Sequence, residues 1–233
     1  TYVGHSVIEE PADKGDGAAF RQHHGIPPEA PLLAVLPGSR RGEVRRLLPV
    51  FTATLARLKE QFPGLHAVVA TVGSVDDAVA ATAAKWPVPT VVVRGVADKY
   101  HAFAAATAAL AASGTVSLEL ALARCPMVIA YKANPLTVWI VRHFMIKIRY
   151  VTVGNLLLDR ALIPELLQEN CRPDRLADAI AMLLRDPEAR RVQIEGALAG
   201  LKQLGLEGPP PSARAARTIL RVIAERGGAV AAS

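Results

Sequence analysis

A turn whose residue types bind phosphate follows the first apolar run of the sequence. Residues 32–36 are all apolar, and Pro37 leads from them into Gly38, Ser39 and Arg40. Glycine lets free backbone amides at the start of a helix approach an anion, and arginine can bind phosphate oxygens in a bidentate manner. The alternative is an ordinary helix start with a serine cap and exposed basic residues, and this turn alone does not decide between the two.

A second turn of the same kind follows the apolar run 108–112. Ser113, Gly114 and Thr115 can place amides and hydroxyls around a diphosphate. About one helical turn further on, the Glu119 carboxylate could accept hydrogen bonds from ribose hydroxyls. The alternative is a helix capped by Thr115, with Glu119 in solvent. Two such turns in one chain favour a nucleotide site over two independent caps.

Two further stretches offer weaker indications. The side-chain amides of Asn155 and Gln168 are suited to binding the edge of a uracil or a sugar, although such groups more often satisfy loop backbone. Residues 135–147 are apolar almost all round, with Arg142, Lys147 and Arg149 near one end. That stretch fits either core packing or a surface that meets acyl chains or an anionic membrane.

Short apolar strands alternating with helices must position these groups. The pattern predicts strands over 32–36, 66–70, 90–93, 108–112 and 127–131, and helices over 18–24, 43–61, 75–85, 99–106, 116–124 and 136–146. Pro49 is expected to kink the second helix or to mark its start. Strands apolar on both faces and separated by helices predict an α/β fold, a Rossmann-like doubly wound parallel sheet.

The chain divides into three predicted parts. Residues 1–30 are punctuated by glycine and proline and are expected to be a linker from a missing N-terminal domain, since Thr1 reads like mid-chain sequence. Residues 31–185 form the predicted α/β domain, which would contain the nucleotide site. Beyond Pro164 the chain is expected to be all-helical, over 175–184, 188–204 and 214–226, so that residues 186–233 form C-terminal helices and a frayed tail.

Composition narrows the class of partner. Hydrophobic residues make up 51% and charged residues 21%, which indicates a globular protein, and the net charge of +6 favours anionic partners. Aromatic residues are only 5% and do not alternate with basic ones, so nucleic acid is not expected. Cys125 and Cys171 fit no metal spacing, which favours a cytoplasmic protein. No apolar run has spanning length, so membrane contact is expected to be peripheral.

Six segments in order carry a family resemblance: LPGSR, ASGTVSLE, PMVIAYK, PLT, YVTVGNLL and PELLQE. From Tyr2 to about residue 185, the chain resembles the C-terminal half of the lipid-A-disaccharide synthases. The resemblance implies the C-terminal half of the two-domain (GT-B type) glycosyltransferase fold, which binds a nucleotide-sugar. It implies a hexosyltransferase peripheral to the inner membrane, with UDP-2,3-diacylglucosamine as donor, 2,3-diacylglucosamine 1-phosphate as acceptor and a β(1→6)-linked disaccharide phosphate as product.

The resemblance also implies roles for particular residues. It places Gly38, Ser39, Arg40, Ser113, Gly114 and Thr115 at the donor phosphates, Glu119 at the ribose, and Asn155 and Gln168 in the donor pocket. No Asp-x-Asp motif is present, so neither metal nor cofactor is expected. The general base is expected in the missing N-terminal domain, which would leave this chain inactive alone. Of the six histidines, only His5 lies in a family motif.

Two other readings remain open at the level of sequence. Another UDP-sugar enzyme of the same fold, such as a peptidoglycan glycosyltransferase or a UDP-N-acetylglucosamine 2-epimerase, would also use a nucleotide turn and a glutamate at the ribose. A non-catalytic module that binds nucleotide or lipid would equally lack a base.

Overall fold

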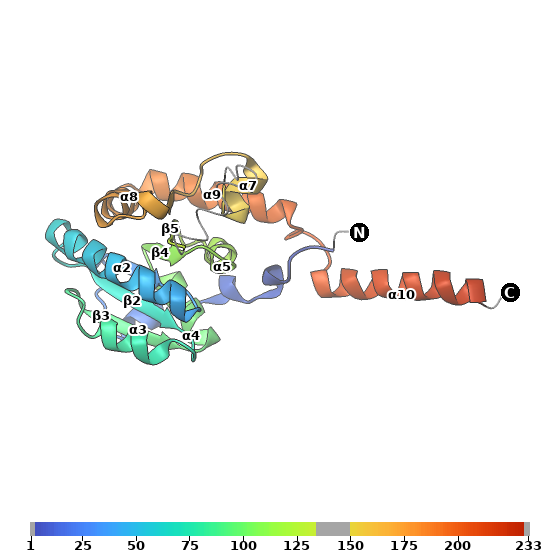
Figure 1. Cartoon of the computed structure of the whole chain (residues 1–233), viewed down its shortest axis with the longest axis horizontal. Coiled ribbons are helices and arrows are strands. Elements are labelled where there is room, and N and C mark those ends of the chain that lie inside the picture. Colours follow the sequence, from blue (N-terminus) through green and yellow to red (C-terminus); the bar gives the residue numbers. More distant parts are fainter. Residues whose placement is uncertain (1–2, 134–149, 231–233) are drawn as a thin grey trace.

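A six-stranded parallel sheet forms the centre of the molecule (Figure 1). The computed structural model describes residues 3–133 and 150–230 of the chain. Every neighbouring pair of strands is parallel, in the order β3-β2-β1-β4-β5-β6. The strands are β1 (Leu32–Leu36), β2 (His66–Thr71), β3 (Thr90–Arg94), β4 (Ala108–Ala112), β5 (Met127–Tyr131) and β6 (Glu165–Leu167). This order confirms the predicted doubly wound α/β fold and puts its switch point between β1 and β4.

The central strands are buried on both faces, which explains their unbroken apolar sequences. In β1, Leu33 and Val35 pack into one core, whereas Leu32, Ala34 and Leu36 pack into the other. This alternation follows from the twofold repeat of a strand, and a strand with a core on each face has no position for a polar side chain.

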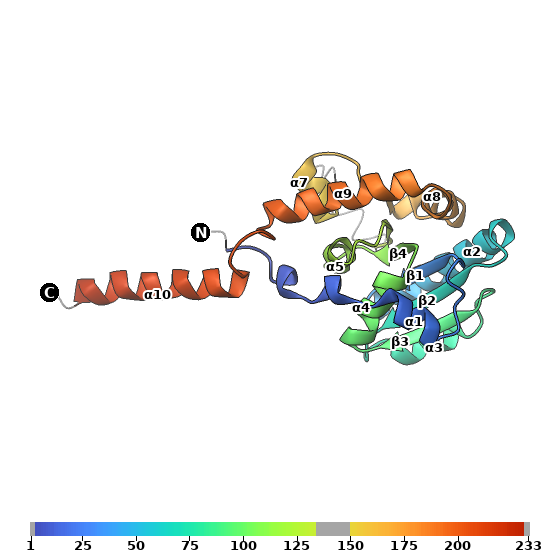
Figure 2. The ribbon, with the colours of Figure 1, turned by 180° about the vertical axis from the view of Figure 1, so that it is seen from behind.

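Helices cover both faces of the sheet. On one face, the core contains side chains of α2 (Arg41–Gln61), α3 (Asp76–Ala83) and α8 (Pro173–Arg185). On the other face, the core contains side chains of α1 (Gly17–His23), α4 (Val96–Ala105), α5 (Val116–Leu122), α7 (Val153–Leu158) and α9 (Pro187–Gln203). Figure 2 shows the molecule from the opposite side to Figure 1. The described residues also form three short 3-10 helices: η1 (Ser6–Glu9), η2 (Ala12–Lys14) and η3 (Gln168–Asn170).

The structure corrects the sequence-based prediction at three places. The helix α2 begins at Arg41, and Pro49 lies inside it rather than at its start. The segment beyond Pro164 is not all-helical, because Glu165–Leu167 forms the edge strand β6 paired with β5. The short helix α7 was not predicted. The helices expected over 175–184, 188–204 and 214–226 are confirmed as α8, α9 and α10 (Pro211–Val230), whereas the helix expected over 136–146 lies outside the described residues.

A glutamine side chain binds the backbone of β5 at Met127, two residues before β5 begins to pair with the short strand β6. Gln193 of α9 is 4% exposed, and its amide binds the backbone of Met127 in β5. Its Oε1 accepts from Met127 N at 2.5 Å, and its Nε2 donates to Met127 O at 3.1 Å. These two bonds join α9 to the sheet.

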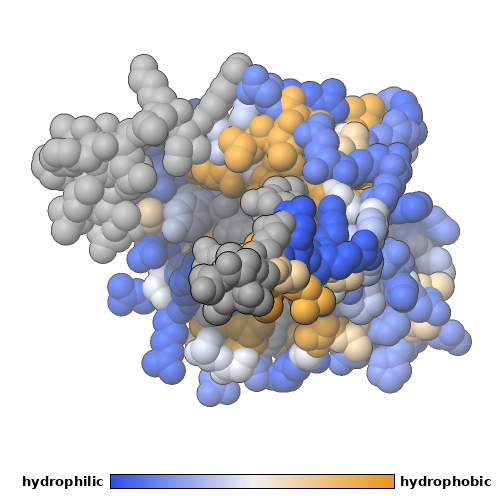
Figure 3. Space-filling model, turned by 90° about the vertical axis from the view of Figure 1, so that its right-hand side faces the viewer, coloured by the Kyte–Doolittle hydropathy of each residue, from blue (hydrophilic) through white to orange (hydrophobic). Residues whose placement is uncertain are grey.

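The last helix, α10, projects away from the rest of the molecule (Figures 1 and 2). Its first turn is tied to the N-terminal segment, since Ser212 N donates to Glu9 Oε1 at 2.6 Å. Further along, Ile219, Leu220 and Ile223 are each about 60% exposed, at 59%, 65% and 60%. Figure 3, which looks at the molecule from this end, shows apolar surface interspersed with polar side chains.

Candidate nucleotide site

A pocket of about 600 Å³ lies at the carboxyl edge of the sheet, over the ends of β1, β2, β3 and β4. We call it the edge pocket. It contains seven of the nine site residues predicted from the sequence: Gly38, Ser39, Arg40, Ser113, Gly114, Thr115 and Glu119. The turns after β1 and β4 meet here because these strands are neighbours across the switch point, the usual ligand position in open α/β sheets.

The turn after β1 depends on a glycine with positive φ. Gly38 has φ +106°, and the Glu43 carboxylate lies against it. Arg40 caps α2 without a side-chain hydrogen bond, so the Ser39 hydroxyl does not serve as the helix cap that an ordinary turn would use. Ser39 and Arg40 are both exposed at the pocket. Their hydroxyl and guanidinium are therefore available to an anion.

The turn after β4 also lacks the side-chain cap of the alternative interpretation. Thr115 is the N-cap residue of α5, yet its hydroxyl makes no capping bond. Glu119 is not a solvated helical residue either, because its side chain is only 16% exposed. Lys99 Nζ donates to Glu119 Oε2 at 2.6 Å. The carboxylate is thus held inside the pocket by an ion pair.

The edge pocket also contains the polar residues Thr71, Asp76, Arg94 and Lys99, which sequence reasoning missed. Arg94 Nε donates to Asp76 Oδ2 at 2.7 Å, and this hydrogen bond raises the pKa of Arg94. Thr71 Oγ1 and Asp76 Oδ1 are buried without a hydrogen-bond partner among the described residues. Thr71 and Arg94 are the last residues of β2 and β3. A polar residue at the end of an apolar strand is visible in the sequence and could have indicated both as site residues.

Among the described residues, one cation of the pocket forms no ion pair with an acidic neighbour. Of the three cations that line it in the described part of the chain, Arg94 pairs with Asp76 and Lys99 with Glu119. Arg40 has no ion-pair partner there. It is therefore the strongest candidate to bind a phosphate oxygen.

Asn155 does not lie in the edge pocket. Its side chain is fully buried, and both ends of its amide are engaged. Nδ2 donates to Ile163 O at 2.7 Å and to Glu165 Oε1 at 2.8 Å, while Oδ1 accepts from the backbone N–H groups of Leu162 and Ile163. The amide thus closes the loop before β6, which is the role that the alternative reading gave it.

Gln168 lies at the same edge of the sheet but outside the edge pocket. It directly follows β6, and its Oε1 accepts from Ala133 N at 3.2 Å. The stretch 135–147, predicted as core or membrane surface, lies outside the described residues. Just before it, Arg46 Nε donates to Lys132 O at 2.8 Å, which ties the end of β5 to α2.

The histidines and cysteines do not form a second chemical centre in the part of the chain that the structure describes. His5 caps η1, since its Nδ1 accepts from Val7 N at 3.2 Å. No three His, Cys, Asp or Glu side chains among the described residues are grouped to hold a metal ion. Cys125 and Cys171 are buried free thiols, and burial raises the pKa of Cys125 to about 12.

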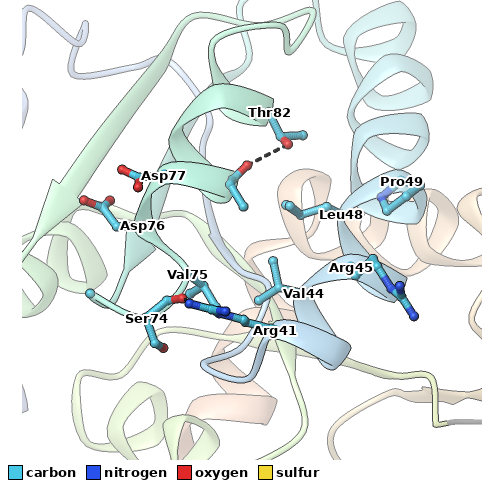
Figure 4. Close-up of a pocket in the computed structure, with 12 residues that line it drawn as sticks. Arg41, Val44, Arg45, Leu48, Pro49, Ser74, Val75, Asp76, Asp77 and Thr82 are labelled. Atoms are coloured by element: carbon cyan, nitrogen blue, oxygen red, sulfur yellow. Dashed lines mark hydrogen bonds between the residues drawn. The ribbon is translucent and has the colours of Figure 1, made fainter.

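A second cavity, of about 630 Å³, lies between α2 and α3 (Figure 4). Val44, Leu48 and Val75 give it an apolar lining, and the Arg41 side chain points toward Ser74. Arg41 Nε donates to Ser74 O at 3.3 Å, and Ser74 Oγ donates to Ser39 O at 3.1 Å. Gly73 and Asp76 of the segment after β2 line both cavities, and these bonds connect that segment to α2 and to the turn after β1.

The topology defines the class of the chain as a Rossmann-like α/β domain of the GT-B type of fold. WaaG, a glycosyltransferase involved in lipopolysaccharide biosynthesis, has the same fold, with a TM-score of 0.56 and 20% identity over 85% of this chain and 50% of WaaG. S. aureus MnaA, in a co-structure with UDP, has a TM-score of 0.58 and 13% identity over 89% of this chain and 56% of MnaA. At such identities the likeness is one of fold alone.

The chain belongs to the lipid-A-disaccharide synthetase family, whose profile matches residues 1–204. It is 55% identical to the lipid-A-disaccharide synthase of Rhodospirillum centenum over 97% of its own length. With that of Paramagnetospirillum magneticum it shares 51% over 95% of its length. It spans only 56% and 57% of these two relatives, so it corresponds to a little more than half of each.

Proposed function

We propose that this chain is the donor-binding half of a hexosyltransferase of lipid A biosynthesis. The reaction would transfer 2,3-diacylglucosamine from UDP to 2,3-diacylglucosamine 1-phosphate and form the β(1→6)-linked disaccharide phosphate. One observation carries the proposal. In a member of this family, two phosphate-type turns and a carboxylate meet in one pocket at the switch point of the sheet.

Within the edge pocket, the two turns would bind the diphosphate of the donor. The backbone amides after Gly38 and Ser113 lie at the starts of α2 and α5, where the helix dipole favours an anion. Arg40 would add a charge-assisted hydrogen bond. Glu119 would accept from a ribose hydroxyl through Oε1, since Oε2 is taken by Lys99.

The transfer needs a base that activates the acceptor hydroxyl and groups that stabilise the leaving UDP. The acceptor 6-hydroxyl would attack the anomeric carbon of the donor as the bond to the diphosphate breaks, and a base would take the hydroxyl proton. Arg40 and the amides of the two turns would stabilise the negative charge that develops on the departing UDP. We propose that the base comes from the half of the relatives that this chain does not span.

Acylated substrates require access to a membrane surface. None of the helices that the structure describes is both long and apolar enough to cross a membrane. We propose a peripheral contact on the cytoplasmic side of the inner membrane, because a net charge of +6 attracts anionic lipid headgroups.

Calorimetry with UDP, in the presence and absence of EDTA, tests the proposal. We expect binding with unchanged affinity in EDTA, because the Arg40 guanidinium and the backbone amides would replace a metal ion at the diphosphate. Binding that disappears with the chelator would contradict the metal-free site. No UDP binding at all, by a chain folded according to its circular dichroism, would contradict the function.

A further inference from the structure

The ion pair between Lys99 and Glu119 uses one carboxylate oxygen and leaves the other open. Lys99 is in the first half of α4 and Glu119 is the middle residue of α5, and both line the edge pocket. Nζ lies 2.6 Å from Oε2, whereas Oε1 receives no hydrogen bond from the described residues. The side chains are only 21% and 16% exposed, so water screens this pair less than it screens a surface pair.

Lys99 also contacts a buried aromatic ring. Its Nζ lies 4.7 Å from the centre of the Tyr100 ring, within the range of a cation–π contact. Tyr100 is 3% exposed, and its hydroxyl donates to Glu10 Oε2 at 3.0 Å. Burial raises the pKa of Tyr100, so the phenol keeps its proton and this hydrogen bond at neutral pH. The ammonium group therefore has a fixed position from which to hold the carboxylate.

We propose that Lys99 is a positioning residue that makes the edge pocket selective for nucleoside diphosphates. It fixes Glu119 with Oε1 directed to a ribose hydroxyl, a group that a bare diphosphate lacks. The inference rests on the proposed function. It names Lys99 as the residue through which the pocket binds a nucleoside diphosphate more tightly than pyrophosphate.

A direct role for Lys99 at the phosphates is the competing possibility, and the two roles differ in their ligand dependence. A cation that binds phosphate contributes equally to UDP and to pyrophosphate. A cation that acts through Glu119 contributes to UDP alone, because pyrophosphate has no ribose.

Calorimetry of Lys99→Met, Lys99→Arg and the control Lys85→Met, with UDP and with pyrophosphate, separates these roles. Lys85 is exposed and lies outside the pocket. We expect Lys99→Met to weaken UDP about tenfold and pyrophosphate by less than about twofold. Lys99→Arg should recover most of the UDP affinity, and Lys85→Met should behave as the unsubstituted chain. In a Glu119→Gln background, Lys99→Met should cause no further loss for UDP.

The outcomes distinguish this inference from the function on which it rests. Equal losses for UDP and pyrophosphate would make Lys99 a phosphate ligand and overturn the inference. An unchanged UDP affinity in Lys99→Met would overturn it while leaving the proposed function intact. Absence of UDP binding by the unsubstituted chain would overturn both. Should Lys99→Met not fold, the cycle of Lys99→Gln with Glu119→Gln gives the same decision.

Discussion

A Cβ atom on Gly38 would overlap Oε2 of Glu43, so the carboxylate occupies the space that any side chain at position 38 needs. Glu43 is only 7% exposed, and the backbone of Gly38 has φ +106°. The turn after β1 is therefore specified twice, once by its backbone conformation and once by the neighbouring side chain.

Replacement of Gly38 by alanine should disturb this turn. We expect Gly38→Ala to lower the free energy of unfolding by about 1–3 kcal/mol and to weaken UDP, because both the positive φ and the contact with Glu43 become unfavourable. Denaturant unfolding and calorimetry measure the two effects. Gly64→Ala is the matched control, since Gly64 has open space around it. Equal stability and UDP affinity in both variants would contradict the prediction.

Arg40 and Glu119 should contribute to different parts of the ligand. We expect Arg40→Ala to weaken both UDP and pyrophosphate, and Glu119→Ala to weaken UDP alone, each by about ten- to hundredfold. Arg57→Ala, on the exposed side of α2, serves as the control. If both site variants keep their UDP affinity while circular dichroism shows an intact fold, the edge pocket is not the nucleotide site.

Asn155 should matter to stability rather than to the ligand. Its removal leaves the buried N–H groups of Leu162 and Ile163 without an acceptor, so we expect Asn155→Ala to cost about 2–4 kcal/mol in the free energy of unfolding. The UDP affinity of the folded protein should stay within about twofold. Asn170→Ala, at an exposed position, is the control. A loss of UDP affinity with normal stability would restore the donor-pocket role predicted for this residue.

The chain alone should form no disaccharide. Loss of a general base reduces a rate by about a hundredfold to ten-thousandfold, and loss of acceptor alignment reduces it further. Mass spectrometry of incubations with both acylated sugars tests this, first with the chain and then with a form extended by its native upstream sequence. We expect product only from the extended form. Turnover by the chain alone would place the base within its own residues, whereas an inactive extended form that binds UDP would favour a non-catalytic module.

The central strands could be predicted closely because each is a short apolar run buried on both faces. The strand β6 could not, since it has three residues and begins with a charged one. The Glu165 carboxylate accepts hydrogen bonds from the backbone of Val151 and Thr152 and from the Asn155 amide, groups that come together only in the folded chain. Local sequence contains no sign of such a partner.

The same distinction applies to the candidate site. Ser39, Arg40 and the residues after β4 directly follow their strands, so the rule for ligand positions in open α/β sheets was enough to bring them together. Lys99 reaches the pocket from the interior of α4, and its partner lies on a different helix. Asn155 had a suitable side chain, but the loop that it closes was not visible in the sequence.

The amide of Gln193 has a consequence for association between chains. On the side of β5 that faces β6, the N–H and C=O of Met127 come before the first residue paired with β6, so without Gln193 they would form an open edge. Open edges of this kind template strand pairing with another molecule and lead to aggregation. Gln193 forms hydrogen bonds with both backbone groups of Met127. A strand of a second chain therefore finds no free N–H or C=O at this position of β5 with which to start pairing.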